Sequence, residues 1–226
     1  MELNDKLTYI SSYCSKALRK NFGRGPHSCQ STLNNNYLVL YVRGFISPME
    51  EVLIQQKQND YVENARNIII THIIEELKGV VQVTLEVDME EYYQDWNFPN
   101  NSGIIILVLE SEISHSEIEI EYDKGEIEKE IGRISALVQK VPNCINSIPI
   151  SQNIVLIERK GILIPIEKAL IARGFSQELI VTKDELEKKY FHRYGKFEVI
   201  FNKSIRDIFI DWNLKEDKSF MCFVLG

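Results

Sequence analysis

The chain has 226 residues, of which 44% are hydrophobic, and its formal net charge is −7 at pH 7. A chain of this length and apolar content can bury a sizeable core, as one large domain or two small ones. A duplex-binding surface needs clustered Lys and Arg to displace counterions, and no run in this acidic sequence supplies one, so no nucleic-acid partner is expected.

The N-terminal stretch has neither the charge pattern nor the continuous apolar segment of a signal peptide. The longest apolar runs, such as residues 104–109, are strand-sized and far shorter than the ~20 residues that a membrane helix needs. The cysteines Cys14, Cys29, Cys144 and Cys222 lie far apart without a C-x-x-C pair, which favours reduced thiols over a zinc or redox motif. We therefore expect a cytoplasmic protein without membrane insertion, metal or other cofactor.

In chain order, the first predicted element is a helix over Leu3–Phe22, because apolar residues recur on one face at alternating spacings of four and three. A polar stretch follows, and then a strand centred on Tyr37–Val42. Ser47 and Glu50 form a predicted capping box, with Pro48 at the first helical position, where its missing N–H costs nothing.

The next predicted helix spans roughly Asp60–Leu77 and stops at Gly79, a position suited to a left-handed residue. Extended sequence, the tripeptide DWN (95–97) and a strand over Ile104–Glu110 complete the first half. The acidic join at 111–126 alternates apolar and charged residues from Ile118 to Tyr122, which indicates an edge strand.

The second half repeats this order. Residues 36–53 (NYLVLYVRGFISPMEEVL) align with residues 153–170 (NIVLIERKGILIPIEKAL), and DWN recurs at 211–213, so that both tryptophans of the chain lie in the same tripeptide. In the second copy Ile164 replaces the capping Ser, a further capping box starts at Thr182, and its helix ends at Gly195.

This register indicates a tandem duplication with units 1–112 and 113–226. The element order predicts an α+β fold of two helix–strands–helix–strands repeats with mainly antiparallel sheet. We expect the two repeats to pack as an intramolecular pseudo-dimer.

The segment NFGRGP (21–26) is the most pointed candidate site, and it has two interpretations. Gly23, Arg24 and Gly25, together with Arg43, could bind a small anion through backbone N–H groups and guanidinium charge. Alternatively, Gly23 ends the helix and a Gly-Pro turn follows. The second interpretation is favoured, because phosphate cradles normally lie at a helix N-terminus and this segment follows a helix.

The DWN tripeptides are interpreted as structural anchors. Asp95 and Asp211 would accept a hydrogen bond from a backbone N–H two residues on, and the Asn of each tripeptide would take a left-handed conformation. Trp96 and Trp212 would fill equivalent buried pockets. The alternative is that the indoles form a ligand platform. The histidines and acidic pairs form no metal or catalytic pattern, so an enzyme is the least favoured class and no catalytic residue is identified.

The segments FGRGP (22–26), RGFISPMEEVL (43–53) and VLE (108–110) resemble the MpsC-like family over residues 3–110. The second half is similar to a degenerate copy, without the Gly-x-Gly turn and the Ser cap. The resemblance implies a link to a bacterial sodium-translocating, membrane-potential-generating system that is also tied to inorganic-carbon uptake. It supplies no catalytic residues.

The leading hypothesis is a non-enzymatic accessory or regulatory protein whose partner is a membrane transport complex or another protein. The alternative is a sensor of a small anion or nucleotide that uses the NFGRGP turn.

Overall fold

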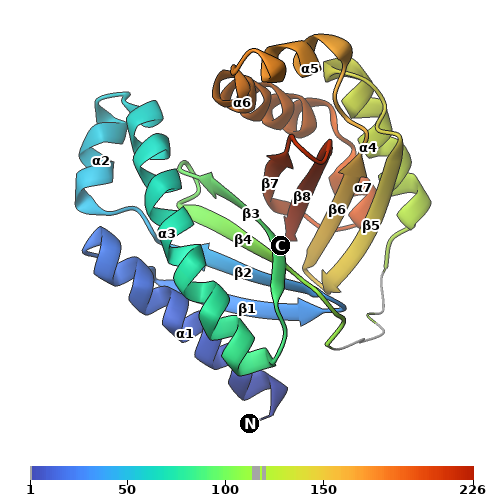
Figure 1. The fold of residues 1–226 in the computed structure, drawn as a ribbon. Coiled ribbons are helices and arrows are strands. Elements are labelled where there is room, and N and C mark those ends of the chain that lie inside the picture. Colours follow the sequence, from blue (N-terminus) through green and yellow to red (C-terminus); the bar gives the residue numbers. More distant parts are fainter. Residues whose placement is uncertain (1, 114–117, 119–120) are drawn as a thin grey trace. The chain divides into compact units, whose positions relative to one another are not determined.

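The computed structural model describes residues 2–113, 118 and 121–226 (Figure 1). The chain divides into two compact units, Met1–Tyr92 with Trp96–Ser116 and Tyr93–Asp95 with Glu117–Gly226. Each unit contains a four-stranded sheet and helices, which confirms the predicted α+β fold. The predicted edge strand from Ile118 to Tyr122 falls largely outside the described residues.

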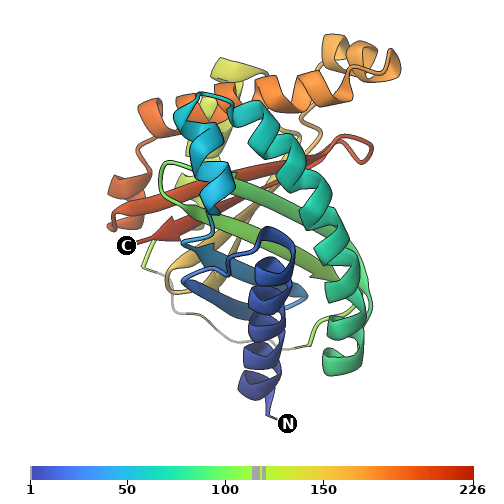
Figure 2. The same ribbon diagram turned by 90° about the vertical axis from the view of Figure 1, so that its left-hand side faces the viewer.

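The first unit places its helices on one face of its sheet (Figures 1 and 2). The sheet has the order β1-β2-β4-β3, and β2 pairs antiparallel with both β1 and β4. The elements are α1 (Leu3–Phe22), β1 (Ser28–Asn34), β2 (Tyr37–Arg43), α2 (Pro48–Gln55), α3 (Asn59–Leu85), β3 (Met89–Asn97) and β4 (Ser102–Leu109).

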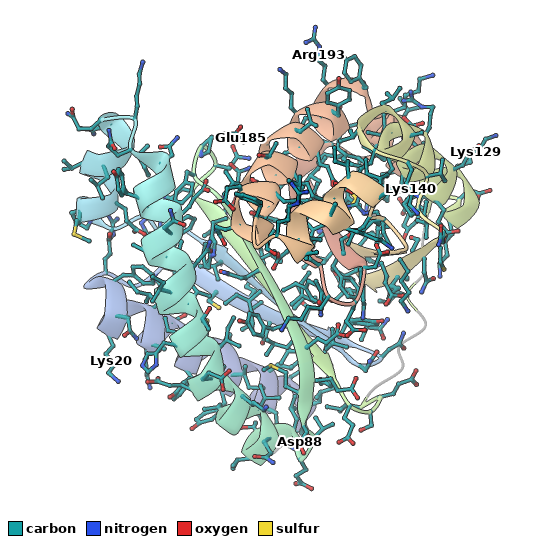
Figure 3. The ribbon with its side chains drawn as sticks, turned by 45° about the horizontal axis from the view of Figure 1, so that its top comes forward. Lys20, Asp88, Lys129, Lys140, Glu185 and Arg193 are labelled. Atoms are coloured by element: carbon teal, nitrogen blue, oxygen red, sulfur yellow. The ribbon has the colours of Figure 1, made fainter. Side chains whose placement is uncertain are left out.

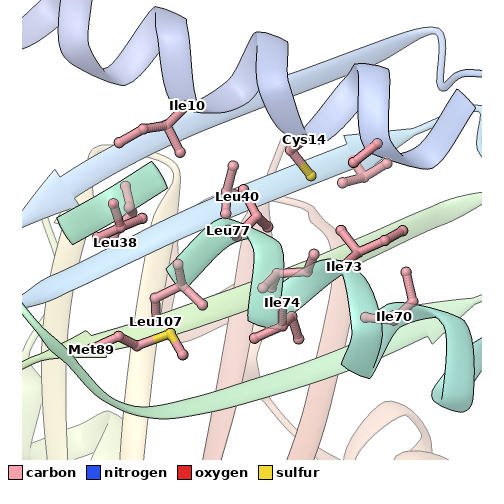
Figure 4. Packing of buried hydrophobic residues seen from close by; sticks show 14 of the residues in the cluster. Ile10, Cys14, Leu38, Leu40, Ile70, Ile73, Ile74, Leu77, Met89 and Leu107 are labelled. Atoms are coloured by element: carbon pink, nitrogen blue, oxygen red, sulfur yellow. The ribbon is translucent and has the colours of Figure 1, made fainter. Parts of the chain in front are cut away.

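The core of this unit lies between the sheet and the helices α1 and α3 (Figure 4). Apolar residues at helical spacing on α1 and α3 pack against the apolar residues that alternate along the inward face of the strands. The core residues labelled in Figure 4 are Ile10, Cys14, Leu38, Leu40, Ile70, Ile73, Ile74, Leu77, Met89 and Leu107.

The second unit has the same strand order, β5-β6-β8-β7, with antiparallel pairing throughout. Its elements are α4 (Lys124–Val138), β5 (Cys144–Ser151), β6 (Ile154–Lys160), α5 (Pro165–Ala172), α6 (Ser176–Tyr194), α7 (Phe197–Phe201), β7 (Ile205–Asn213) and β8 (Lys218–Leu225). The shared order is what the aligned halves of the sequence lead one to expect. The duplication itself stays an inference from the sequence.

The predicted stop at Gly79 is wrong, because α3 continues through it to Leu85. A glycine inside a helix costs only about 1 kcal/mol relative to alanine. Beyond it, Val81 and Leu85 are buried and extend the apolar stripe of the helix, and their burial offsets that cost.

Three further expectations fail in the middle of the units. The polar stretch before β2 contains a strand, β1, which sequence patterning missed. Thr182 is not a cap, since it lies inside α6 and its hydroxyl donates to the Glu178 carbonyl at 2.7 Å. The segment after Gly195 forms the short helix α7 instead of extended chain.

The DWN tripeptides end the strands β3 and β7 instead of forming turns. In each case the Asn makes the turn contact, because Asn97 accepts from the Asn100 N–H and Asn213 accepts from the Glu216 N–H, both at 3.2 Å. The left-handed residues come four positions after each Asn, at Asn101 (φ 51°) and Asp217 (φ 50°).

Asn101 and Asp217 occupy aligned positions and make the same contacts in their own units. The Asn101 Oδ1 accepts from the N–H groups of Phe45 and Ile46 at 2.7 and 3.0 Å. The Asp217 Oδ1 accepts from the N–H groups of Ile162 and Leu163, both at 2.7 Å. The side chain therefore holds the loop that follows Gly44 in one unit and Gly161 in the other.

We predict that Asp217→Asn is tolerated at pH 7, because Asn101 shows that an amide oxygen can make both bonds. The Asp217→Asn variant loses only the ion pair with Lys168, whose side chain is 58% exposed, so its free energy of unfolding should fall by about 0–1 kcal/mol. Asp217→Ala removes both bonds and should cost about 1–3 kcal/mol. Urea unfolding measures both, and equal costs for the two variants would show that the two backbone bonds contribute nothing.

The same variant carries a pH signature. Burial acts to raise the pKa of Asp217, but the two N–H groups and Lys168 outweigh it and hold the pKa below the ordinary 3.8. The carboxylate therefore stabilises the fold above that pH, and the advantage of the wild type over Asp217→Asn should vanish as the pH falls below it.

Candidate functional site

The candidate turn begins where α1 ends. Gly23 caps the helix in the left-handed region with φ 73°, a conformation that favours glycine. A Cβ on Gly23 would meet nothing within 4 Å, so backbone conformation alone selects glycine there. At position 25 the limit is space instead of backbone conformation, because a Cβ on Gly25 would lie 2.9 Å from the Arg19 Nε. The Arg19 side chain therefore folds back over the turn.

Further basic side chains lie along the same turn. The Arg24 Nη2 lies 3.2 Å from the His27 Nε2, and the His27 ring lies against Gly44, where a Cβ would come within 2.3 Å of it. The His27 N–H donates to the Arg43 carbonyl at 2.8 Å. The end of β2 is thus fastened to the turn, and Arg43 lies at the same end of the sheet as Arg24.

The positive charge of this turn is not neutralised by the part of the chain that the structure describes. No ion pair reaches the guanidinium groups of Arg19, Arg24 or Arg43 within that part. Lys20, which extends from the same end of α1 in Figure 3, is 72% exposed and lies 3.6 Å from Glu76. We name the set Arg19, Arg24, His27 and Arg43 the basic turn.

The aligned segment of the second unit has similar side-chain contacts but no glycine, and Gln139 after α4 has φ −146° instead of a left-handed conformation. The Lys140 Nζ lies 3.4 Å from the Asn143 Oδ1, and Asn143 lies against Gly161, as His27 lies against Gly44. Lys160, which aligns with Arg43, is paired with Glu158 at 3.1 Å. The second unit therefore has no unpaired cluster at this place among the residues described.

Beneath the basic turn lies a buried cation. The Arg66 side chain is 1% exposed, and its guanidinium carbon lies 4.2 Å from the ring centre of Phe22, 4.1 Å from Phe45 and 4.6 Å from Trp96. Its Nη1 has no hydrogen-bond partner among the described residues, and the negative faces of the three rings compensate its charge there. Phe22 directly precedes Gly23, and Phe45 directly follows Gly44.

Glu50 supplies the counter-charge. Its Oε1 accepts from the Arg66 Nε at 2.9 Å, and its Oε2 accepts from the Ser47 N–H at 2.8 Å. The Ser47 hydroxyl accepts from the Glu50 N–H in return, which confirms the predicted capping box. Burial lowers the pKa of Arg66 to about 10, against the opposing effect of Glu50, so Arg66 stays charged at neutral pH.

The second unit has an analogous buried network. Lys183 aligns with Arg66, and its Nζ lies 3.2 Å from Glu167, which aligns with Glu50. It also lies 3.0 Å from Glu187, which in turn pairs with Arg159 at 2.7 Å. Gln139 stands where the first unit has Phe22 and donates to Glu167 at 2.6 Å. Two buried cations thus face two buried carboxylates.

The four predicted anchors lie at strand ends. Trp96 and Trp212 belong to the core clusters of their units, and each is 7% exposed. Asp95 precedes Trp96 in β3, and the Asp211 Oδ1 accepts from the N–H of Trp212, one residue on, at 2.7 Å. The anchor role of these residues stays a prediction. Among the described residues, no group of three potential metal ligands comes together.

The fold and these buried charges define an α+β protein with two units of like topology. The basic turn of the first unit makes no ion pair with the residues that the structure describes. Residues 5–111 match the family described as Na+-translocating membrane potential-generating system (MpsC), as the resemblance in the sequence led us to expect. No curated protein and no solved structure matches the chain. Within the described residues, no helix is both long enough and apolar enough to cross a bilayer.

The buried pair predicts a non-additive response to mutation. Glu50→Gln leaves the Arg66 charge unpaired, and Arg66→Met leaves the Glu50 carboxylate unpaired, so each should cost about 3–5 kcal/mol. The double variant removes both charges, and Met packs well against aromatic rings. Its cost should therefore fall at least about 1 kcal/mol short of the sum. Denaturant unfolding of all four proteins measures this, and strict additivity would contradict the coupling.

Proposed function

We propose that the chain is a non-enzymatic, cytoplasmic accessory or regulatory protein of a sodium-translocating, membrane-potential-generating system. The match of residues 5–111 to the MpsC family carries this proposal. The partner would be a membrane transport complex, and inorganic-carbon uptake would depend on the same system.

A non-enzymatic role accords with where the charges lie. Here the buried carboxylates of Glu50, Glu167 and Glu187 are each engaged by a buried cation of their own unit. These groups therefore satisfy the interior of each unit instead of facing a substrate.

The accessory role is tested in cells that lack the gene for this chain. We expect the sodium-dependent part of the membrane potential, measured with a potential-sensitive dye, to fall in such cells. Inorganic-carbon uptake should fall with it, and the intact chain should restore both. Unchanged potential and uptake after removal of the gene would contradict the proposal.

A second candidate function is favoured by one observation, the unpaired charge of the basic turn. Three guanidinium groups that make no ion pair with any described residue, in a chain of net charge −7, create a local positive field that attracts anions. Guanidinium groups match phosphate and carboxylate oxygens with paired N–H donors. We therefore propose an anion-sensing role for the first unit alone, with inorganic phosphate, bicarbonate or a nucleotide phosphate as the ligand class.

Thermal shifts test the sensing role, because a ligand that binds only the native state raises its stability. We expect phosphate, bicarbonate or ATP to raise the melting temperature of the wild type but not of Arg24→Ala, whose unliganded stability should stay within about 0.5 kcal/mol. Lys140→Ala is the matched control at the aligned position of the second unit and should keep the full shift. An equal shift in both variants, or none in the wild type, would sink the sensing role.

A further inference from the structure

Two cysteines that are distant in the sequence meet in the first unit. Cys14 lies on the buried face of α1, is fully buried and points toward the sheet (Figure 4). Cys29 lies in β1, is half-buried and packs against the same core cluster. The spacing of the cysteines along the chain did not indicate this meeting.

The register of β1 explains it. The Ser31 hydroxyl donates to the Leu7 carbonyl of α1 at 2.6 Å, so that face of β1 lies against the helix. Cys29 is two residues from Ser31 and shares its face of the strand. The pKa of the Cys14 thiol is well above its usual range, chiefly because it hydrogen-bonds with the Cys29 thiol and also because it is buried. Cys14 and Cys29 therefore lie in the same interface between α1 and β1, within one core cluster.

Cys29 can be reached from outside. It lines a groove of about 440 Å³ between α1 and β1. The other lining residues are Asn4, Leu7, Thr8, Ser11, Gln30, Ser31 and Thr32. Most of these carry hydroxyl or amide groups, which suit a small polar reagent such as a hydroperoxide. Cys14 lies behind Cys29 and has no such access.

We propose that Cys14 and Cys29 form an oxidisable thiol pair, which hydrogen peroxide or an organic hydroperoxide converts into an intramolecular disulfide between α1 and β1.

The reaction balances with one peroxide. The Cys29 sulfur, as thiolate, attacks a peroxide oxygen and the O–O bond breaks, which yields a sulfenic acid on Cys29. The departing oxygen takes up the thiol proton and leaves as water or alcohol. The Cys14 sulfur then attacks the Cys29 sulfur, the S–O bond breaks, and the hydroxyl leaves as water with the Cys14 proton. Two thiols are oxidised and one peroxide is reduced.

The bond would close the loop that carries NFGRGP, because the basic turn's Arg19, Arg24 and His27 all lie between the two cysteines. A cross-link around this loop limits the conformations of the glycine turn without touching its side chains. The thiol pair is thus placed to alter the turn, although the pair itself does not depend on any ligand of the turn.

The full chain with Cys144→Ser tests the pair, since Cys144 is exposed and would otherwise form intermolecular bonds. After treatment with equimolar hydrogen peroxide, remaining thiols are alkylated in denaturant and the protein is cut with trypsin. We expect the peptide of residues 7–16 to be disulfide-linked to the peptide of residues 25–43, and dithiothreitol to separate the two by reducing the bond. Cys222 should be fully alkylated.

Cys29→Ser, at the half-buried position, is the main control. It should fold and leave Cys14 alkylated at every peroxide dose. The proposal is overturned if Cys29 becomes sulfinic acid while Cys14 stays alkylatable, or if neither thiol reacts.

Discussion

The buried Arg66 guanidinium is the constraint on which the first unit depends. A charge taken out of water is costly unless its surroundings replace the lost hydration. Here the replacement comes from Glu50 and from the rings of Phe22, Phe45 and Trp96. These groups come from the end of α1, the loop after β2, the first turn of α2 and the end of β3, so the charge is compensated only when all these elements are in place. The basic turn lies next to this buried cluster, because Phe22 and Phe45 directly adjoin Gly23 and Gly44.

The second unit meets the same constraint with different chemistry. A lysine ammonium is a compact point charge that stacks on rings less well than guanidinium and needs oxygen partners. Lys183 accordingly has two carboxylates, Glu167 and Glu187, and Arg159 balances the second one. Gln139 replaces a ring with a hydrogen-bond donor. The capping Glu and the Trp persist in both units while the glycine turn does not, which separates what the fold requires from what the first unit adds.

Local patterns were enough to predict α1, the core of β2 and the capping box at Ser47, because each depends on neighbours within one or two turns. They failed for Gly79 and Thr182, since helix length there is decided by packing against the sheet. The turn at NFGRGP (21–26) could also be predicted, because it too depends only on neighbouring residues. Arg66 and the thiol pair were missed because their partners are distant in sequence. The aligned halves contain one pattern that could have indicated the buried pairs. Glu50 is followed sixteen residues later by Arg66, and Glu167 is followed sixteen residues later by Lys183.

The basic turn is held from both sides, which has a consequence for any ligand that it binds. Phe22 precedes its glycine and Phe45 follows Gly44, so both flanks are fixed on Arg66. The glycines of the turn, Gly23 and Gly25, lie between the two cysteines. A disulfide there would reduce the conformational freedom that an anion must otherwise freeze on binding, and a preordered site binds more tightly. Because coupling between two sites is reciprocal, an anion that orders the turn would in the same measure favour closure of the disulfide. Oxidation and anion binding would then act on the same turn while the buried pair beneath it stays unchanged.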